Sequence, residues 1–145
     1  KDHAYIFNAW SNGKRTYRAE PMAGLTYRAM KRAGEKNPGL YNRVHHLEYR
    51  TVEEFYDLRK DPFCLENLLP NNQRDATSKS SKQALEMLRQ KLRTWMMDYN
   101  DYALDAFEHR DSSEALDQFM KDYTERSGKE VEALKPYEDA KRYRF

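Results

Sequence analysis

The amino-acid sequence predicts an α+β fold, in which short strands combine with several helices. Residues 4–10 have the composition of a strand that is largely apolar on both faces, whereas residues 54–58 carry different side chains on the two faces. Residues 81–99 repeat apolar side chains at steps of three and four, which is the period of an amphipathic helix. We expect this long helix to be the main source of cohesion.

A polar loop follows the first predicted strand. Residues 11–14 carry a turn signal, and residues 15–20 are polar and irregular. Residues 25–33 have the pattern of a short helix with apolar and basic side chains on different sides. The apolar face of this helix consists of Leu25, Ala29, Met30 and Ala33.

A second helix is predicted to start at Asn37 and Pro38, because asparagine caps helix N-termini and proline fits the first helical position. We expect it to run to about Leu47 and to return the chain to the second strand. That strand must end before Pro62, since proline removes a backbone donor.

The turn after the second strand combines polar and apolar residues. Asp61 and Asn67 can satisfy backbone donors of the turn. The apolar anchor predicted after the turn consists of Leu65, Leu68 and Leu69.

The long helix is predicted to begin at Ser80 or Ser81, after a polar connection, and to end at Tyr99. Its apolar stripe contains Leu85, Leu88, Leu92, Trp95, Met96 and Tyr99, and its solvent side contains Glu86, Arg89, Gln90 and Arg93.

The C-terminal part of the chain is predicted to be helical after an ambiguous segment that ends near Arg110. A helix opens at Ser112 and ends at Ser127 and Gly128, and a last turn precedes Pro136. Residues 135–145 are charged and aromatic, and we expect them to fray unless a partner holds them.

The composition describes one polar domain, or one subdomain with a tail, that can bury only a modest core. Of the 145 residues, 39% are hydrophobic and 34% are charged, and the mean hydropathy is −1.13. A formal net charge of +2 does not point to nucleic acid. No apolar run approaches the length of a membrane span.

We predict no catalytic residue and no metal ligand in this chain. His45 and His46 are adjacent, so on a helix they point in different directions and are poorly placed to share a metal. Cys64 has no evident base beside it. For the acids Glu53, Glu54, Asp57 and Asp61, roles in turns and toward solvent are expected, because strand alternation separates the side chains.

The basic loop at residues 14–20 is the candidate binding site that the sequence favours. It lies between a predicted strand and a predicted helix, where binding residues concentrate. Arginine guanidinium groups match sulfate or carboxylate groups through paired hydrogen bonds. We therefore predict that Arg15, Arg18 and Glu20 contact a substrate. The alternative interpretation is a solvated surface or an interdomain contact.

The second predicted strand and its turn resemble the signature of a known family. Residues 54–58 (EFYDL), 60–62 (KDP) and 66–68 (ENL) are similar to a signature near the C-terminal end of sulfatases. Residues 5–8 (YIFN) resemble the strand that precedes this signature in the family. The motifs follow one another in the order expected for a sulfatase.

Further features are similar to the sulfamidase branch of the family, the N-sulfoglucosamine sulfohydrolases or heparan N-sulfatases. They are Arg50 before the signature, and residues 85–89 (LEMLR) with Leu92 and Trp95 after it. The resemblance implies an alkaline-phosphatase-like C-terminal subdomain, in which the two strands share a small antiparallel sheet with helices packed on it. It covers roughly residues 4–105.

This resemblance predicts a sulfatase C-terminal subdomain at residues 1–110 and a helical tail at residues 111–145. Sulfatases use a formylglycine, made from the cysteine of a C-x-P-S-R motif, beside a calcium ion. The motif does not occur in this sequence. We therefore expect calcium and formylglycine in the parent protein, but no cofactor and no catalysis in this chain.

The resemblance also implies partners and a location. The expected partners are the catalytic domain of the same sulfatase and its sulfated glycan substrate, with neither nucleic acid nor a membrane. The parent would be periplasmic, secreted or lysosomal. Two other functions stay open, namely an independent binding module for acidic glycans or a protein partner, and a structural piece that oligomerises through the tail helix.

Overall fold

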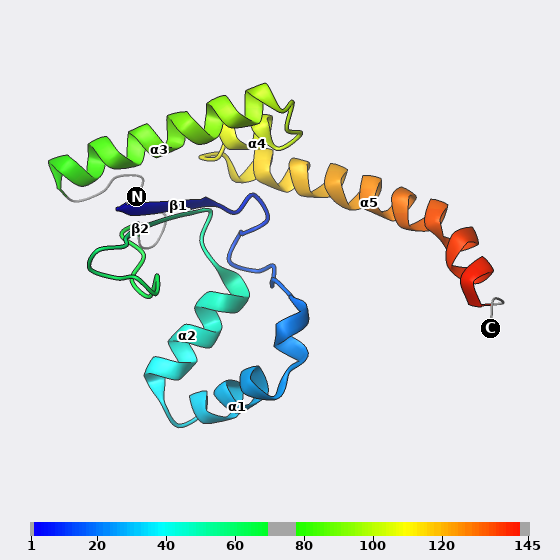
Figure 1. Cartoon of the computed structure of the whole chain (residues 1–145), viewed down its shortest axis with the longest axis horizontal. Coiled ribbons are helices and arrows are strands. Elements are labelled where there is room, and N and C mark those ends of the chain that lie inside the picture. The colour runs from blue at the N-terminus through cyan, green and yellow to red at the C-terminus, as the bar shows by residue number, and fades with distance from the viewer. Residues whose placement is uncertain (1, 70–77, 143–145) are drawn as a thin grey trace.

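The computed structural model describes residues 2–69 and 78–142, and of residues 130–142 it describes the backbone only. Figure 1 shows α3 lying along the two strands and the hairpin of α1 and α2 on the other side of them. In chain order, the elements are β1 (His3–Phe7), the 3₁₀ helix η1 (Glu20–Ala23), α1 (Leu25–Gly34), α2 (Pro38–Tyr49), β2 (Glu53–Asp57), α3 (Lys79–Asp98), α4 (Leu104–Glu108) and α5 (Ser113–Arg142).

The two strands form an antiparallel sheet, so the predicted α+β class and the predicted pairing are confirmed. His3 lies opposite Asp57, and the pairing ends with Phe7 opposite Glu53. The prediction that the first strand reaches residue 10 is wrong. The amide of Ser11 donates to the carbonyl of residue 8 at 3.0 Å, which turns the chain soon after Phe7.

The predicted helix starts have identifiable caps. The side chain of Asn37 accepts a hydrogen bond from the amide of Leu40 at 3.1 Å, as predicted for α2. That helix ends when Arg50 adopts a φ of 53°, in the left-handed region. The prediction for α3 was late by one or two residues, because Ser78 is the residue that caps it, accepting from the amide of Ser81.

Helices cover both faces of β2, and its central residues are completely buried. On one face, Phe55 packs against Leu69 and Leu85 to form the hydrophobic core. On the other face, Glu54 and Tyr56 lie under α2. The sheet is therefore the middle layer between α3 and the α1–α2 hairpin.

The turn after β2 behaves largely as predicted. Asp61 accepts hydrogen bonds from the amides of Leu65 and Glu66 at 2.6 and 2.8 Å. Asn67 accepts from the amide of Phe55 at 2.9 Å. The prediction that Leu65 belongs to the apolar anchor is wrong, because its side chain is exposed and the anchor is formed further along the chain.

The apolar stripe of α3 is rotated relative to the prediction. The side that faces the sheet follows positions 85, 89, 92 and 96, so Arg89 is buried although it was expected in solvent. Trp95 and Tyr99 were assigned to the stripe and are exposed, with their rings 5.1 Å apart.

The last helix is longer than predicted. The sequence indicated an end at Ser127 and Gly128 and a separate turn before Pro136, but α5 continues through these positions to Arg142. A Cβ at Gly128 would meet nothing within 4 Å, so glycine there costs only helix propensity, about 1 kcal/mol. The expected fraying falls partly on residues 143–145, which lie outside the described residues.

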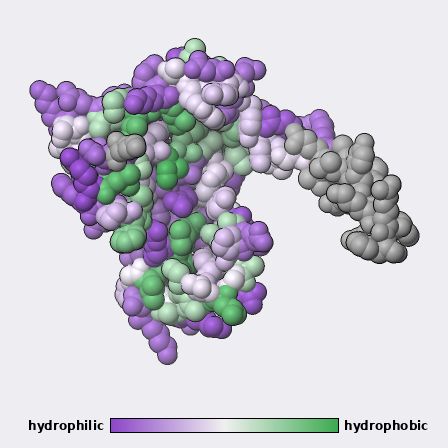
Figure 2. All heavy atoms as spheres, in the orientation of Figure 1, coloured by the Kyte–Doolittle hydropathy of each residue, from purple (hydrophilic) through white to green (hydrophobic). Residues whose placement is uncertain are grey.

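Several apolar side chains of the described residues remain uncovered. The predicted apolar face of α1 faces open space in part, since Leu25 is 81% exposed and Ala29 is exposed. Figure 2 shows hydrophobic side chains over the middle of the face in view and again on the α1–α2 hairpin. No helix within residues 2–69 and 78–142 combines the length and apolar character needed to cross a membrane.

Candidate functional site

The structure places the three predicted binding residues in different surroundings. A guanidinium nitrogen of Arg15 lies 2.8 Å from a carboxylate oxygen of Asp117, so this side chain fastens the loop to α5. Arg18 is exposed, and within the described part of the chain its guanidinium has no ion-pair partner. Glu20 is exposed at the start of η1. Of the three, Arg18 is the side chain best placed to meet a ligand.

A cavity of about 480 Å³ lies beside this loop, and Arg18 is part of its lining. The opposite wall comes from the helical hairpin and contains Tyr27, Lys31 and Glu48. The loop is held here by its backbone, because the amide of Tyr17 donates to the carbonyl of Glu48 at 2.7 Å. Two cationic side chains from separate elements therefore line one cavity.

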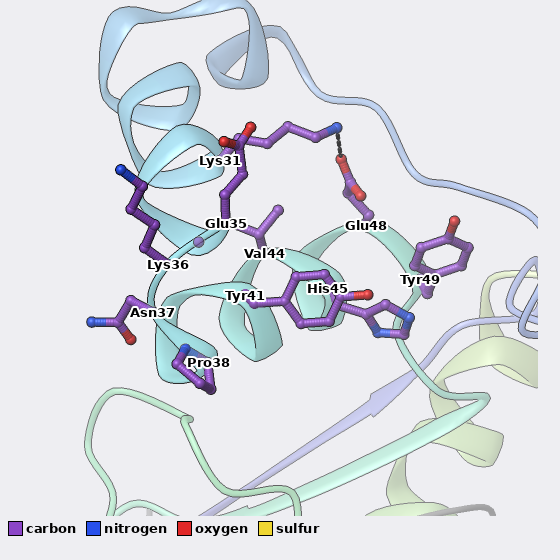
Figure 3. A pocket seen from close by; sticks show the side chains of 11 residues that line it. Lys31, Glu35, Lys36, Asn37, Pro38, Tyr41, Val44, His45, Glu48 and Tyr49 are labelled. Carbon is purple, nitrogen blue, oxygen red and sulfur yellow. Dashed lines mark hydrogen bonds and ion pairs between the residues drawn. The ribbon is translucent and has the colours of Figure 1, made fainter.

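A larger cleft, of about 820 Å³, lies between α1 and α2 (Figure 3). The ammonium group of Lys31 lies 2.7 Å from a carboxylate oxygen of Glu48, and the hydroxyl of Tyr27 donates to the same oxygen at 2.6 Å. Hydrogen bonds from Lys31 and Tyr27 lower the pKa of Glu48. Burial and the bond to Glu48 raise the pKa of Tyr27 to about 12.

One wall of this cleft is a row of rings along α2. Tyr41, His45 and Tyr49 recur every fourth residue, and the His45 and Tyr49 rings stack with centroids 4.5 Å apart. A Cβ at Gly34 would lie 3.2 Å from the backbone of Tyr41, so glycine allows the two helices to approach closely. The cleft offers rings and a paired lysine for binding, but no nucleophile beside a base.

A network centred on Glu53 lies between β2 and α3. Its carboxylate accepts two hydrogen bonds from Arg89, at 2.8 and 2.7 Å, and a third from Arg110 at 3.0 Å. The hydroxyl of Tyr5 donates to it as well. Burial, followed by the hydrogen bond to Glu53, raises the pKa of Tyr5. Burial opposes the charge of Arg89, but the hydrogen bonds that Arg89 donates to the carboxylates of Glu53 and Glu86 prevail and raise its pKa.

A second network, centred on Glu54, lies between β2 and α2. This carboxylate is 0% exposed, and it accepts hydrogen bonds from Arg50 at 2.9 Å, Tyr56 at 2.7 Å and Asn8 at 3.0 Å. A ring nitrogen of His46 lies 3.8 Å from it. Burial and the bond to Glu54 raise the pKa of Tyr56. Burial lowers the pKa of His46, although Glu54 opposes that shift.

Lowering the pH is expected to destabilise the fold through His46. Since the folded state holds the pKa of His46 below the ordinary value of 6.5, the unfolded chain takes up its proton first. The contribution of His46 to the free energy of unfolding is fully present above pH 6.5, the ordinary pKa of histidine. It is lost as the pH falls through the lowered pKa of the folded state. Urea unfolding of the wild type and His46→Gln measures this effect, and the variant is expected to lose less stability on acidification.

The exposed neighbour His45 provides the matched control for this measurement. Replacement His45→Gln changes a histidine of the same helix that does not contact Glu54. Parallel pH dependences for the wild type and His46→Gln would contradict the role assigned to His46.

The acids of β2 were interpreted incorrectly from the sequence. Glu53 and Glu54 were expected in turns or in solvent, but they are the centres of two buried networks on opposite faces of the strand. Asp57 and Asp61 do bind turn amides, as predicted. A signal was present, because Arg89 occupies an internal position of the long helix, four residues after Leu85, where an arginine requires a buried partner.

Histidine and cysteine do not form a reactive group in the described part of the chain. His45 is exposed and His46 is half-buried, so the adjacent rings diverge, as predicted. Cys64 is a half-buried free thiol. Within residues 2–69 and 78–129, whose side chains the structure describes, no three side chains of the types His, Cys, Asp or Glu are grouped so as to hold a metal ion.

Comparison of the chain with protein-family models, with curated proteins and with solved structures finds no match.

Proposed function

We propose that the chain is the C-terminal subdomain of a sulfatase, closest to the sulfamidase branch, that completes the fold and flanks the substrate cleft. The observation that carries this proposal is the pairing of the two motif segments. Residues 5–8 and 54–58 resemble successive sulfatase motifs, and their strand portions pair in one antiparallel sheet, with Tyr5 opposite Phe55 and Ile6 opposite Glu54.

The polar residues of the signature also hold the strand and its turn together through hydrogen bonds, which supports treating the signature as one structural unit. Asp61 binds two amides of the turn. Asn67 accepts from the amides of Phe55 and Leu69 and donates to the carbonyl of Glu53. A signature in which Asp61 and Asn67 organise the strand and its turn is expected in a structural subdomain.

Uncovered apolar surface favours a subdomain that packs against a larger neighbour. Leu25 on α1, Phe63 in the turn and Trp95 on α3 are 81%, 75% and 51% exposed. Large apolar side chains at a domain interface are covered by the neighbouring domain, whereas in this chain by itself these three face open space. The catalytic domain of the same sulfatase is the partner that the proposal assigns to these surfaces.

In the parent protein, the reaction would be hydrolysis of a sulfate ester, or of the N-sulfate of a glucosamine in a heparan-type glycan. A hydrated formylglycine and a calcium ion of the catalytic domain would supply the nucleophile and stabilise the charge of the transferring group. Arg15, Arg18 and Glu20 would flank the cleft, with Arg18 as the guanidinium that is open to a sulfate group.

The test is to express the chain within its complete reading frame. The proposal expects a C-x-P-S-R motif upstream and hydrolysis of N-sulfoglucosamine or an aryl sulfate after formylglycine formation. The 145-residue chain alone is expected to leave both substrates intact. Turnover by the chain alone, or a reading frame without the motif, contradicts the proposal.

In that complete protein, Arg18→Ala is expected to raise the KM for a sulfated glycan about tenfold with a smaller change in kcat. One charge-assisted hydrogen bond is worth roughly 1.5–3 kcal/mol, which corresponds to a factor of about ten or more. Arg59→Ala is the matched control, since Arg59 is an exposed arginine in the turn after β2. An unchanged KM for Arg18→Ala in steady-state kinetics would contradict the prediction that Arg18 contacts the substrate in the cleft.

The second candidate function is an independent module that binds acidic glycans. The exposed basic side chains Arg28 and Arg32, one turn apart on α1, favour it. Such a module would bind heparin as the isolated chain, with an affinity that falls steeply as salt is added. Absence of heparin binding at low salt would eliminate this candidate.

A further inference from the structure

A cavity of about 640 Å³ lies where β1 and the loop after it meet α3 and α5. Half of the residues that line it are aromatic, and they come from separate parts of the chain. We call it the aromatic cavity, and its rings include those of Trp10, Tyr17, Tyr102, Phe119 and Tyr123. Its volume falls within the range of about 300–1,000 Å³ that is usual for small-molecule sites.

The aromatic cavity carries one negative charge. Asp101 has the only charged side chain among the described residues that line it. One carboxylate oxygen of Asp101 accepts a hydrogen bond from the amide of Ala103 at 2.8 Å. Within the described part of the chain, this carboxylate forms no ion pair with a lysine, arginine or histidine. A cationic ligand would therefore meet a carboxylate that no described side chain neutralises.

Two rings of the aromatic cavity bind a cation of the protein itself. The guanidinium carbon of Arg126 lies 3.8 Å from the centroid of the Tyr102 ring and 5.9 Å from that of the Tyr123 ring. Both rings line the aromatic cavity, whereas Arg126 lines a smaller cavity that shares these rings. The face of an aromatic ring is negative and attracts a cation within about 6 Å of its centre. The rings and the carboxylate therefore favour the same sign of charge.

We propose that the aromatic cavity binds a small organic cation that carries a quaternary ammonium group. The methyl groups of the ligand pack on the rings, and its positive charge lies near the carboxylate of Asp101. This inference goes beyond the sulfatase subdomain proposed above and does not depend on it, because it uses only residues of this chain.

Other classes of ligand fit this lining less well. An anion would meet the carboxylate of Asp101 and the negative ring faces, with no cation among the described lining residues to offset them. A metal ion such as calcium needs about six to eight oxygen ligands, and the lining offers a single carboxylate. A primary ammonium group brings three donors that need acceptors, whereas a quaternary ammonium group has none to satisfy.

The two cavities described earlier differ from the aromatic cavity in charge. The cavity beside the basic loop is lined by Arg18 and Lys31, and the cleft between α1 and α2 is lined by Lys31 and Lys36. A cation that entered either of them would meet a positive side chain. Of the three, the aromatic cavity is therefore the one in which a cationic ligand is expected.

Tryptophan fluorescence of the full 145-residue chain tests the proposal. The chain has two tryptophans, and Trp95→Phe leaves Trp10, which lines the aromatic cavity, as the only one. Tetramethylammonium chloride is titrated at constant ionic strength, and tert-butanol serves as a neutral molecule of similar shape. The dissociation constant is expected to be at least about tenfold lower for tetramethylammonium. Equal constants would indicate a merely apolar cavity, and either this result or the absence of a response to tetramethylammonium overturns the proposal.

Asp101→Asn isolates the contribution of the charge. The asparagine keeps a side-chain oxygen for the amide of Ala103 and removes the negative charge. The dissociation constant for tetramethylammonium is expected to rise about tenfold, while that for tert-butanol stays unchanged. Asp98→Asn is the matched control, because it neutralises an exposed aspartate at the end of α3 that does not line the cavity. Equal effects of the two substitutions on tetramethylammonium binding contradict the contact with Asp101.

Paired substitutions of Tyr123 separate the ring face from simple apolar contact. Tyr123→Leu keeps an apolar side chain that suits helix α5 but removes the ring, whereas Tyr123→Phe keeps the ring. The dissociation constant for tetramethylammonium is expected to rise about fivefold for Tyr123→Leu and to stay within about twofold for Tyr123→Phe. Equal constants for the two variants overturn the contact between the cation and this ring.

Discussion

Glu53→Ala is expected to lower the free energy of unfolding by about 3–5 kcal/mol, because it leaves a buried arginine without its carboxylate. The side chains of Glu53 and Arg89 are each only 10% exposed, and two hydrogen bonds join them. Arg110 loses the same partner, but its side chain is 22% exposed and can turn toward water. Urea unfolding followed by circular dichroism measures the loss.

Glu86→Ala is the matched control, since Glu86 binds the same arginine from the surface. Its carboxylate lies 2.6 Å from Arg89, and its side chain is 68% exposed. Exposed ion pairs contribute about 0–1 kcal/mol, so this variant should remain close to the wild type. Combining Glu53→Leu with Arg89→Leu removes both charges and is expected to recover much of the loss. Equal effects of Glu53→Ala and Glu86→Ala would contradict the burial of the Glu53 network.

The parts of the fold that were predicted correctly depend on local chemistry. The cap at Asn37, the turn at Asp61 and the end of β2 before Pro62 all follow from properties of single residues and their immediate neighbours. The continuation of α5 through Gly128 and Pro136 was missed for the same reason. Both residues disfavour helix interiors locally, yet neither forces a break when the flanking residues favour a helix.

The buried networks could not be located from local patterns alone. Alternation along β2 separates Glu53 from Glu54, but it does not reveal that helices cover both faces of the strand. That arrangement depends on contacts far apart in the sequence, such as Glu53 with Arg89 and Glu54 with Asn8. Of the candidate site, the sequence predicted that Arg18 lies in a loop. It did not predict that Arg15 forms an ion pair with Asp117 of α5, which is distant in the sequence.

Phe55→Ala is expected to destabilise the chain by about 3–5 kcal/mol, because it opens a cavity at the centre of the molecule. The ring of Phe55 is completely buried, packs against Leu69 and Leu85, and stacks on His3 with ring centroids 5.1 Å apart. A small domain has a total stability of about 5–15 kcal/mol, so a loss of this size moves the urea midpoint far toward zero.

Phe63→Ala is the matched control, because it tests whether the loss of stability depends on the buried position of the ring. It deletes the same ring only eight residues further along the chain, at a site that is 75% exposed, and it should change the stability of the isolated chain by less than about 0.5 kcal/mol. Under the function proposed above, by contrast, the exposed ring would lie against the catalytic domain of the complete protein, and its removal should weaken that contact. A small effect of Phe55→Ala would mean that α3 does not cover this face of β2, and the assignment of the core would then be wrong.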